Sequence, residues 1–166
     1  QHHAEPLALV AAPDRATLTS APIIQGTAEI EHLFKLKMIN YPFVLLEDVR
    51  GIQANVVAVD NIKAIKRAVK YLINSGHSKI VHFAGPAQSC HTQERIEGFR
   101  YAFSESTLAF KPEMIVSIGS HYDECLARTL EYFKNKNAQD YPTAIVCFND
   151  HQALAVMMAL KELNIR

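Results

Sequence analysis

Polar and aromatic side chains gather in three short segments, each of which follows an apolar run. The candidates are an arginine, an asparagine, an aspartate, two histidines and a tyrosine: Arg95, Asn149, Asp150, His91, His121 and Tyr122. Guanidinium and amide groups satisfy hydroxyls or ring nitrogens, and an aromatic ring covers an apolar face. This mixture predicts a binding site for a polyhydroxylated or heterocyclic small molecule.

Two of these candidate groups have a structural alternative at this stage. Arg95 could pair with Glu94 or Glu97 on a solvated helix face. Asn149 and Asp150 could serve as an N-cap for the final helix, and capping is the preferred interpretation for Asp150.

Sequence position also bears on which aromatic ring could contact a ligand and on the roles of two further histidines. Either His121 or Tyr122 could be the ring that faces the ligand. His82 lies inside a predicted strand and His77 follows a predicted helix end, so we interpret both as structural.

Helices that alternate with short apolar strands must position these side chains. The spacing of apolar residues predicts helices over 28–38, from Asp60 to Gly76, and over 93–104, 122–134 and 151–163; it predicts strands over 41–46, 56–59, 79–84, 114–118 and 143–148. Crossover helices between strands require a parallel sheet with helices on both faces. Ligands bind such sheets at the carboxyl ends of the strands, so the three segments should converge on one edge.

The helix that follows the second strand has a sequence signal at each end. Asp60 can accept hydrogen bonds from the first amides of this helix, and Gly76 suits the left-handed position that ends it. By contrast, residues 1–20 lack a periodic pattern apart from the apolar run 7–12, and we leave them unassigned as a tag remnant, a frayed start or a single strand.

Composition excludes several classes of function. Seventeen basic residues balance seventeen acidic ones, so the chain has no net positive charge to hold DNA directly. The 49% hydrophobic content is typical of a globular protein, and no apolar run approaches the roughly 18 residues that span a bilayer. Three cysteines without framework spacing, and no signal peptide, predict reduced thiols in a cytoplasmic protein.

Four motifs in register resemble the LacI/GalR family of bacterial transcription regulators. They are Val59-Asp60-Asn61 continuing through Tyr71 to Ile80, then Gly85-Pro86, then Glu94-Arg95-Ile96-Glu97-Gly98-Phe99, and finally Thr143-Ala144-Ile145 to Phe148-Asn149-Asp150. The resemblance covers about residues 40–166. It implies the type I periplasmic-binding-protein-like fold, with residues 21–60 as the end of the N-terminal lobe and a crossover, and 61–166 as most of the C-terminal lobe.

The resemblance also implies a function and a set of contacts. It implies an effector-sensing domain that binds a sugar or sugar derivative between two lobes, without a cofactor, in a homodimer. Operator DNA would be bound by a helix-turn-helix domain outside this chain. We expect the chain itself to be a truncated form of the regulator. Arg95 and Asn149 would contact the effector, His91 would add a polar contact, and His121 or Tyr122 would supply the ring.

Two other classes of function remain open at this stage. A sugar-binding protein of a transport system would share the two-lobed fold. A zinc site or an enzyme could use Cys90, His91, His121, Asp150 and His151, but no pair of them has a tight metal-binding spacing. Because the sequence also lacks a phosphate loop and a nucleophile elbow, we predict neither catalysis nor a bound metal.

Overall fold

The computed structural model describes residues 21–25, 30–46 and 51–165. The chain divides into two compact units, residues 1–59 and residues 60–166, and each is treated by itself below. The apolar run 7–12 lies outside the described residues.

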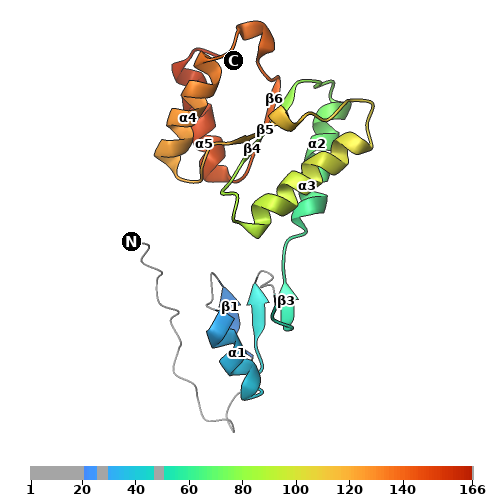
Figure 1. Ribbon diagram of the computed structural model, residues 1–166, viewed down its shortest axis with the longest axis vertical. Helices are drawn as coiled ribbons and strands as arrows, with labels where there is room; N and C mark the ends of the chain where they lie inside the picture. The colour runs from blue at the N-terminus through green and yellow to red at the C-terminus, as the bar shows by residue number, and fades with distance from the viewer. Residues whose placement is uncertain (1–20, 26–29, 47–50, 166) are drawn as a thin grey trace. The chain divides into compact units, whose positions relative to one another are not determined.

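The first unit is a small parallel sheet with one helix. Its described elements are β1 (Ile23–Gln25), α1 (Ile30–Met38), β2 (Val44–Leu46) and β3 (Asn55–Val57), and the strands pair in the order β1-β2-β3 (Figure 1). The core comprises Ile24, Leu33, Phe43, Leu45 and Ile52. The sequence pattern missed β1, since three residues are too few to carry a periodicity.

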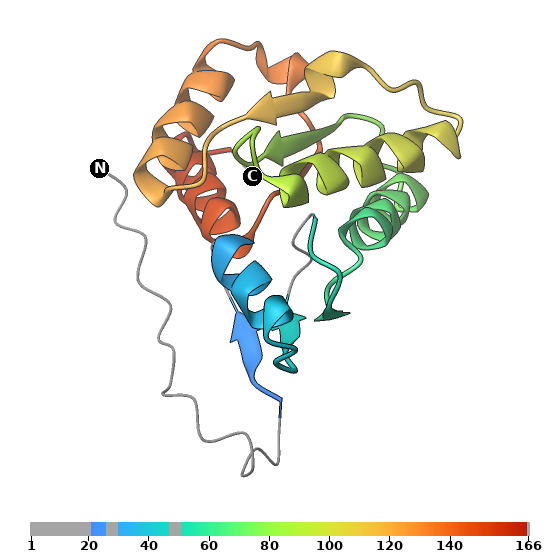
Figure 2. The same cartoon turned by 60° about the horizontal axis from the view of Figure 1, so that its bottom comes forward.

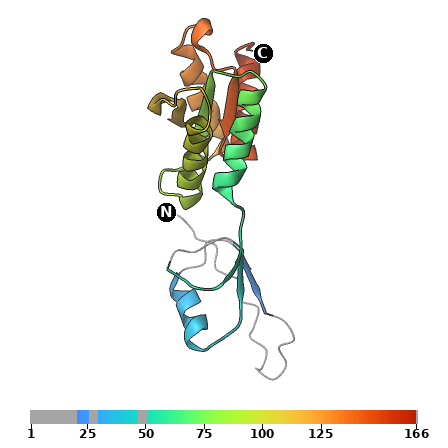
Figure 3. The ribbon, with the colours of Figure 1, turned by 90° about the vertical axis from the view of Figure 1, so that its right-hand side faces the viewer.

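The second unit contains the three strands and four helices that position the candidate side chains. Its strands are β4 (Ile80–Ala84), β5 (Ile115–Ser117) and β6 (Ala144–Cys147), and its α-helices are α2 (Asn61–Asn74), α3 (Cys90–Ser104), α4 (Tyr122–Lys134) and α5 (Asp150–Glu162). All pairings are parallel in the order β5-β4-β6. Figures 2 and 3 show α2 and α3 on one side of this sheet and α4 and α5 on the other.

Two apolar layers hold these helices to the sheet. The layer under α2 and α3 is built around Val69, Ile80 and Phe99. The layer under α4 and α5 is built around Phe83, Phe133 and Val156. The strand β4 contributes to both layers and is buried throughout, as a central strand covered on both faces should be. The predicted α/β class, a parallel sheet with helices on both faces, is confirmed.

The capping signals around α2 are confirmed. Asp60 accepts a hydrogen bond from the Lys63 amide at 2.8 Å, and Gly76 follows the helix with a φ of +92°. In this left-handed region glycine avoids the steric penalty that a Cβ would bring.

The predicted start of α3 is wrong by three residues. The helix begins at Cys90, after Ser89 in the extended N-cap conformation, and the Gln93 side chain donates to the Ala87 carbonyl at 2.8 Å. His91 therefore lies in the first helical turn rather than in a loop, and Arg95 lies in the second turn rather than the first.

The helices α2 and α3 cross in close contact at Gly98. A Cβ on Gly98 would lie 2.4 Å from the backbone oxygen of Ile62. Only glycine permits this approach without a shift of one helix. The crossing fixes the face of α3 that carries Arg95.

None of the described helices is both long and apolar enough to cross a membrane.

Candidate ligand-binding site

Arg95 reaches from α3 to the segment that follows β6. Its Nε donates to Asn61 Oδ1 at 3.0 Å, and its Nη1 donates to the carbonyl oxygen of Phe148. The guanidinium carbon also lies 4.6 Å from the centroid of the Phe148 ring. This combination of directional bonds and ring stacking holds the guanidinium at the edge of the sheet.

The Phe148 ring lies against the loop after β4. A Cβ on Gly85 would lie 2.7 to 2.8 Å from three carbons of that ring, so a larger residue at 85 would displace it. Gly85 therefore permits the ring position that Arg95 stacks upon.

Asn61 is a buried side chain that organises the candidate site and that the sequence analysis missed. It is buried at the start of α2, its amide donates to Glu94 Oε2 at 2.8 Å, and it lies 3.3 Å from His91 Nδ1. His91 Nδ1 and Glu94 Oε2 are 3.6 Å apart. One amide thus orients Arg95, Glu94 and His91 together. Its position directly after the capping Asp60 was visible in the sequence, but its chemical role was not.

Gln152 joins the ends of all three strands and was also missed. Its Nε2 donates to the Gly119 carbonyl at 3.0 Å and to the Ala84 carbonyl at 3.4 Å, and its Oε1 accepts from the Phe148 amide at 2.7 Å. Ala84 ends β4, Gly119 follows β5 and Phe148 follows β6. The only signal in the sequence was a polar residue on the apolar face of a helix.

Asn149, not Asp150, is the N-cap of α5. Asn149 Oδ1 accepts from the Gln152 amide at 2.8 Å. Asp150 is exposed in the first helical turn, so the preferred capping role for Asp150 is wrong. Extended backbone at Asn149 lets its side chain reach the Gln152 amide three residues on, whereas Asp150 Oδ1 accepts from the adjacent His151 amide at 3.1 Å.

The two candidate rings, His121 and Tyr122, lie at the start of α4. His121 is the residue before the helix and Tyr122 is its first residue, and both are exposed. Their loop is tied to α5 through the bond between Gly119 and Gln152. The structure brings this loop to the edge of the sheet and exposes both rings.

His82 is a buried neutral side chain in the central strand. It is fully buried, Nδ1 lies 2.8 Å from the Val146 carbonyl, and the ring stacks on Phe99 with centroids 5.5 Å apart. Burial lowers the pKa of His82; the Val146 bond partly opposes this, and the charge of Arg95 lowers the pKa further. The interpretation of His82 as structural agrees with this environment.

Two cysteines lie on the other face of the sheet from α3. Burial raises the pKa of Cys147 to about 11, and it also raises the pKa of Cys125. Both thiols are therefore protonated at neutral pH. Within the part of the chain that the structure describes, no three His, Cys, Asp or Glu side chains gather in a way that could hold a metal ion.

A family comparison covers most of this chain. Residues 19–166 match the family described as periplasmic binding proteins and the sugar binding domain of the LacI family. The chain belongs to this family. The LacI resemblance and the periplasmic-binding-protein-like fold predicted from the motifs are confirmed.

The curated relatives of this chain include transcriptional repressors. The HTH-type transcriptional repressor PurR of Vibrio vulnificus is 39% identical over 99 residues, which is 60% of this LacI-family chain and 29% of that protein. The chain thus spans less than a third of the length of this relative.

Solved structures show the same fold. A regulatory protein of the LacI family from Chloroflexus aggregans superposes with a TM-score of 0.76 at 24% identity, covering 86% of this chain and 51% of that one. A sugar-binding transcriptional regulator of the LacI family from Escherichia coli, solved in complex with phosphate, gives a TM-score of 0.72 at 21% identity, covering 87% and 52%.

Proposed function

We propose that this LacI-family chain is the effector-sensing part of a transcription regulator and is not an enzyme. The observation that carries the proposal is the edge at the carboxyl ends of β4, β5 and β6, where Gln152 joins the three loops and Arg95 spans from α3 to Phe148. Such an edge is where parallel sheets bind small molecules, and the relatives named in the comparison are repressors rather than enzymes.

The effector that we favour is a purine-type heterocycle. Its support is the set of relatives named PurR, which reach 39% identity. The proposed contacts fit a planar ring with several nitrogens: Arg95 and Asn149 as polar partners, and His121 or Tyr122 as a stacking ring. His91 and Asp150 complete the proposed set.

A sugar or sugar derivative is the second candidate effector. The family description names a sugar binding domain, and the Escherichia coli regulator is described as sugar-binding. The same guanidinium and amide groups would serve sugar hydroxyls, so the choice depends on measured affinity. A transport protein with the same fold is a weaker proposal, since the named relatives are repressors.

The proposed mechanism is a shift between two arrangements of the regulator. An effector that binds one arrangement more tightly raises its population, and the attached DNA-binding domains respond to that change. Differential affinity is the only source of such a shift, so effector and operator must each alter the affinity of the regulator for the other.

We propose that the regulator acts as a homodimer that uses α5. Three exposed apolar side chains, Leu154, Met157 and Met158, lie on one face of this helix. Asp150 and Lys161 lie on the same face at opposite ends of the helix. Two antiparallel copies would pair each Asp150 with the Lys161 of the other copy and bury the apolar stripe between them, which is a self-complementary interface.

Titration calorimetry of the 166-residue chain with two panels tests the effector. One panel holds purine bases and nucleosides, and the other holds monosaccharides, cellobiose and sugar phosphates. We expect saturable binding of a purine and a higher melting temperature in its presence. Saturation by a sugar alone would overturn the purine assignment, and no binding from either panel would contradict the sensor proposal.

Arg95→Ala tests the location of the site. Loss of the guanidinium should weaken binding by at least about tenfold, since bonds to a charged donor typically contribute 1.5 kcal/mol or more. Arg67→Ala, an exposed arginine on α2, is the matched control and should bind as the parent does. Equal affinity of the Arg95→Ala chain and the parent would remove Arg95 from the site.

A further inference from the structure

Gln152 is a polar side chain in an otherwise apolar position. It is fully buried, and the other buried residues of α5 are Ala155, Val156 and Ala159. Burial of an amide is costly unless its hydrogen bonds are made. An apolar residue of similar size would pack this face of the helix without that cost. The hydrogen bonds of Gln152 are therefore what distinguishes it from an apolar residue at this position.

The nitrogen and the oxygen of the Gln152 side-chain amide both form hydrogen bonds, and their partners lie at the ends of three different strands. The two donated bonds go to the carbonyls of Gly119 and Ala84, and the oxygen accepts from the amide of Phe148. One side chain therefore sets the spacing of the loops after β4, β5 and β6, which are not adjacent in the sequence.

The backbone of Gln152 adds a fourth tie. Its amide donates to Asn149 Oδ1, the cap of α5. The side chain of Gln152 thus holds Phe148, and its backbone amide holds Asn149. The carbonyl of Phe148 in turn accepts from Arg95. A shift of Gln152 would move the partner of Arg95 and the cap of α5 together.

We infer that Gln152 is a positioning residue that places the three ligand-binding loops relative to one another. Because Gln152 is fully buried, its proposed role is to hold the loops rather than to contact a ligand. An effect of Gln152 on ligand affinity rests on the proposed function, whereas its effect on the loops does not.

Two substitutions separate the donated bonds from the accepted one. Gln152→Met keeps the length of the side chain and removes every side-chain hydrogen bond, while the backbone bond to Asn149 stays. Gln152→Glu keeps an acceptor for the Phe148 amide and removes the donors to Gly119 and Ala84. Phe133→Leu is the matched control, because Phe133 is buried near the far end of α4, away from these loops, and its truncation loosens the core.

The first readout needs no ligand. Amide signals of Gly85, Ser120 and Asn149 should shift together in the NMR spectra of both Gln152 variants. Exchange of the Phe148 amide with solvent should accelerate by about fivefold or more in Gln152→Met, and much less in Gln152→Glu, because a lost hydrogen bond contributes roughly 1 kcal/mol or more. Phe133→Leu should produce neither change at these loops.

The second readout is affinity for whichever purine or sugar the parent chain binds. Both Gln152 variants should bind about tenfold more weakly, while Phe133→Leu should bind as the parent does at a temperature where all are folded. The inference is overturned if the loop signals of the Gln152 variants match those of the parent, or if Phe133→Leu moves them equally. If no probe binds the parent, the proposed function fails and the loop signals still decide the inference.

Discussion

At the scale of single residues, the site depends on side chains that hold other side chains. Arg95 is fixed by Asn61 and Phe148, and the same Asn61 amide reaches Glu94 and His91. Such second partners restrict the rotamers of a long, flexible arginine before a ligand arrives. Less ordering entropy is then lost on binding, which favours affinity.

The pH dependence of stability should reveal the buried His82. Its pKa is lowered in the folded chain from an ordinary value of 6.5, so the unfolded chain takes up its proton first as the pH falls. The contribution of His82 is therefore constant above pH 6.5 and becomes destabilising below it, by up to about 1.4 kcal/mol per pH unit.

Denaturant unfolding of the parent and His82→Phe between pH 8 and pH 5 checks this expectation. The phenyl ring retains the stacking on Phe99 and cannot titrate. The difference in unfolding free energy between the two chains should change in favour of the variant as the pH falls. Parallel curves across the whole range would show that His82 does not titrate with folding.

At the scale of elements, three helices begin at the edge that carries the candidate site. The helices α3, α4 and α5 start at Cys90, Tyr122 and Asp150, each shortly after a strand ends. Helix N-termini present unpaired amides and a partial positive charge. The repeated strand-to-helix turn thus supplies polar groups to one edge of the sheet even before side chains are considered.

Gly98→Ala should disrupt the packing of α2 on α3. The new Cβ would collide with the Ile62 carbonyl, which is backbone and cannot rotate away. We expect a loss of about 2 kcal/mol or more in unfolding free energy, in the range of overpacked cores. Denaturant unfolding measures this loss. Glu97→Ala, an exposed neighbour on α3, is the control and should change stability by less than about 0.5 kcal/mol.

Met157→Glu tests the proposed dimer contact on α5. A two-fold interface would receive two new carboxylates, one from each copy, in its apolar stripe, so dimerisation should weaken by at least about tenfold. Sedimentation equilibrium gives the dissociation constant. Tyr71→Glu replaces a comparably exposed apolar side chain on α2 and should leave self-association unchanged. Equal association of all three chains would place the interface elsewhere.

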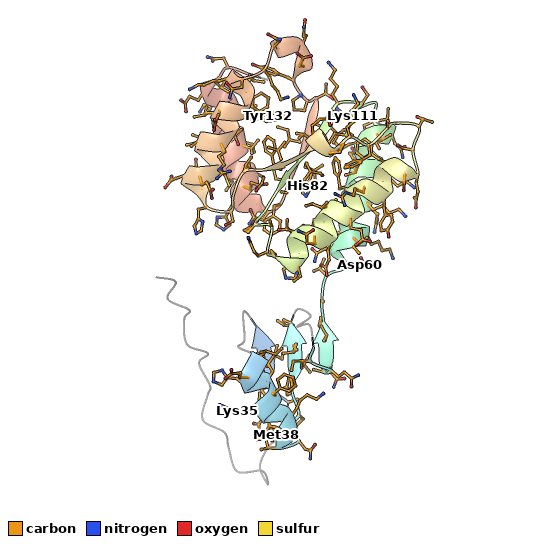
Figure 4. All side chains as sticks on the ribbon, in the orientation of Figure 1. Lys35, Met38, Asp60, His82, Lys111 and Tyr132 are labelled. Atoms are coloured by element: carbon orange, nitrogen blue, oxygen red, sulfur yellow. The ribbon has the colours of Figure 1, made fainter. Side chains whose placement is uncertain are left out.

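At the scale of the whole molecule, the chain consists of two units with separate cores. Ile24, Leu33 and Leu45 belong to the first core, while both core layers of the second unit lie within residues 60–166. Figure 4 shows Met38 in the first unit, Asp60 where the second begins, and His82 and Tyr132 within the second. A unit with its own core on both faces of a sheet should fold without its neighbour.

Residues 60–166 produced alone should therefore fold cooperatively. We expect a sigmoidal thermal transition by circular dichroism and dispersed amide signals that superpose on those of the whole chain. The control is the whole chain under the same conditions. A broad, non-cooperative transition with collapsed signal dispersion would show that the second unit requires the first.

The sequence by itself determined the alternation of helices and strands, the parallel sheet and the family. Apolar periodicity and the caps at Asp60 and Gly76 are local signals, so they can be recognised without coordinates. The sequence predicted the ends of helices less accurately, as the start of α3 at Cys90 and the cap at Asn149 demonstrate. The backbone torsion angles decide which residue caps a helix. Two neighbouring polar residues such as Asn149 and Asp150 look equally suitable in the sequence.

Only the tertiary structure decided how the candidate side chains are held. Asn61 and Arg95 are separated by 34 positions in the chain, and Gln152 and Ala84 by 68, yet each pair is joined by a hydrogen bond. Such bonds depend on the crossing of α2 with α3 and on the strand order β5-β4-β6. The residue type determines which hydrogen bonds a side chain can donate or accept, but long-range packing determines its partner.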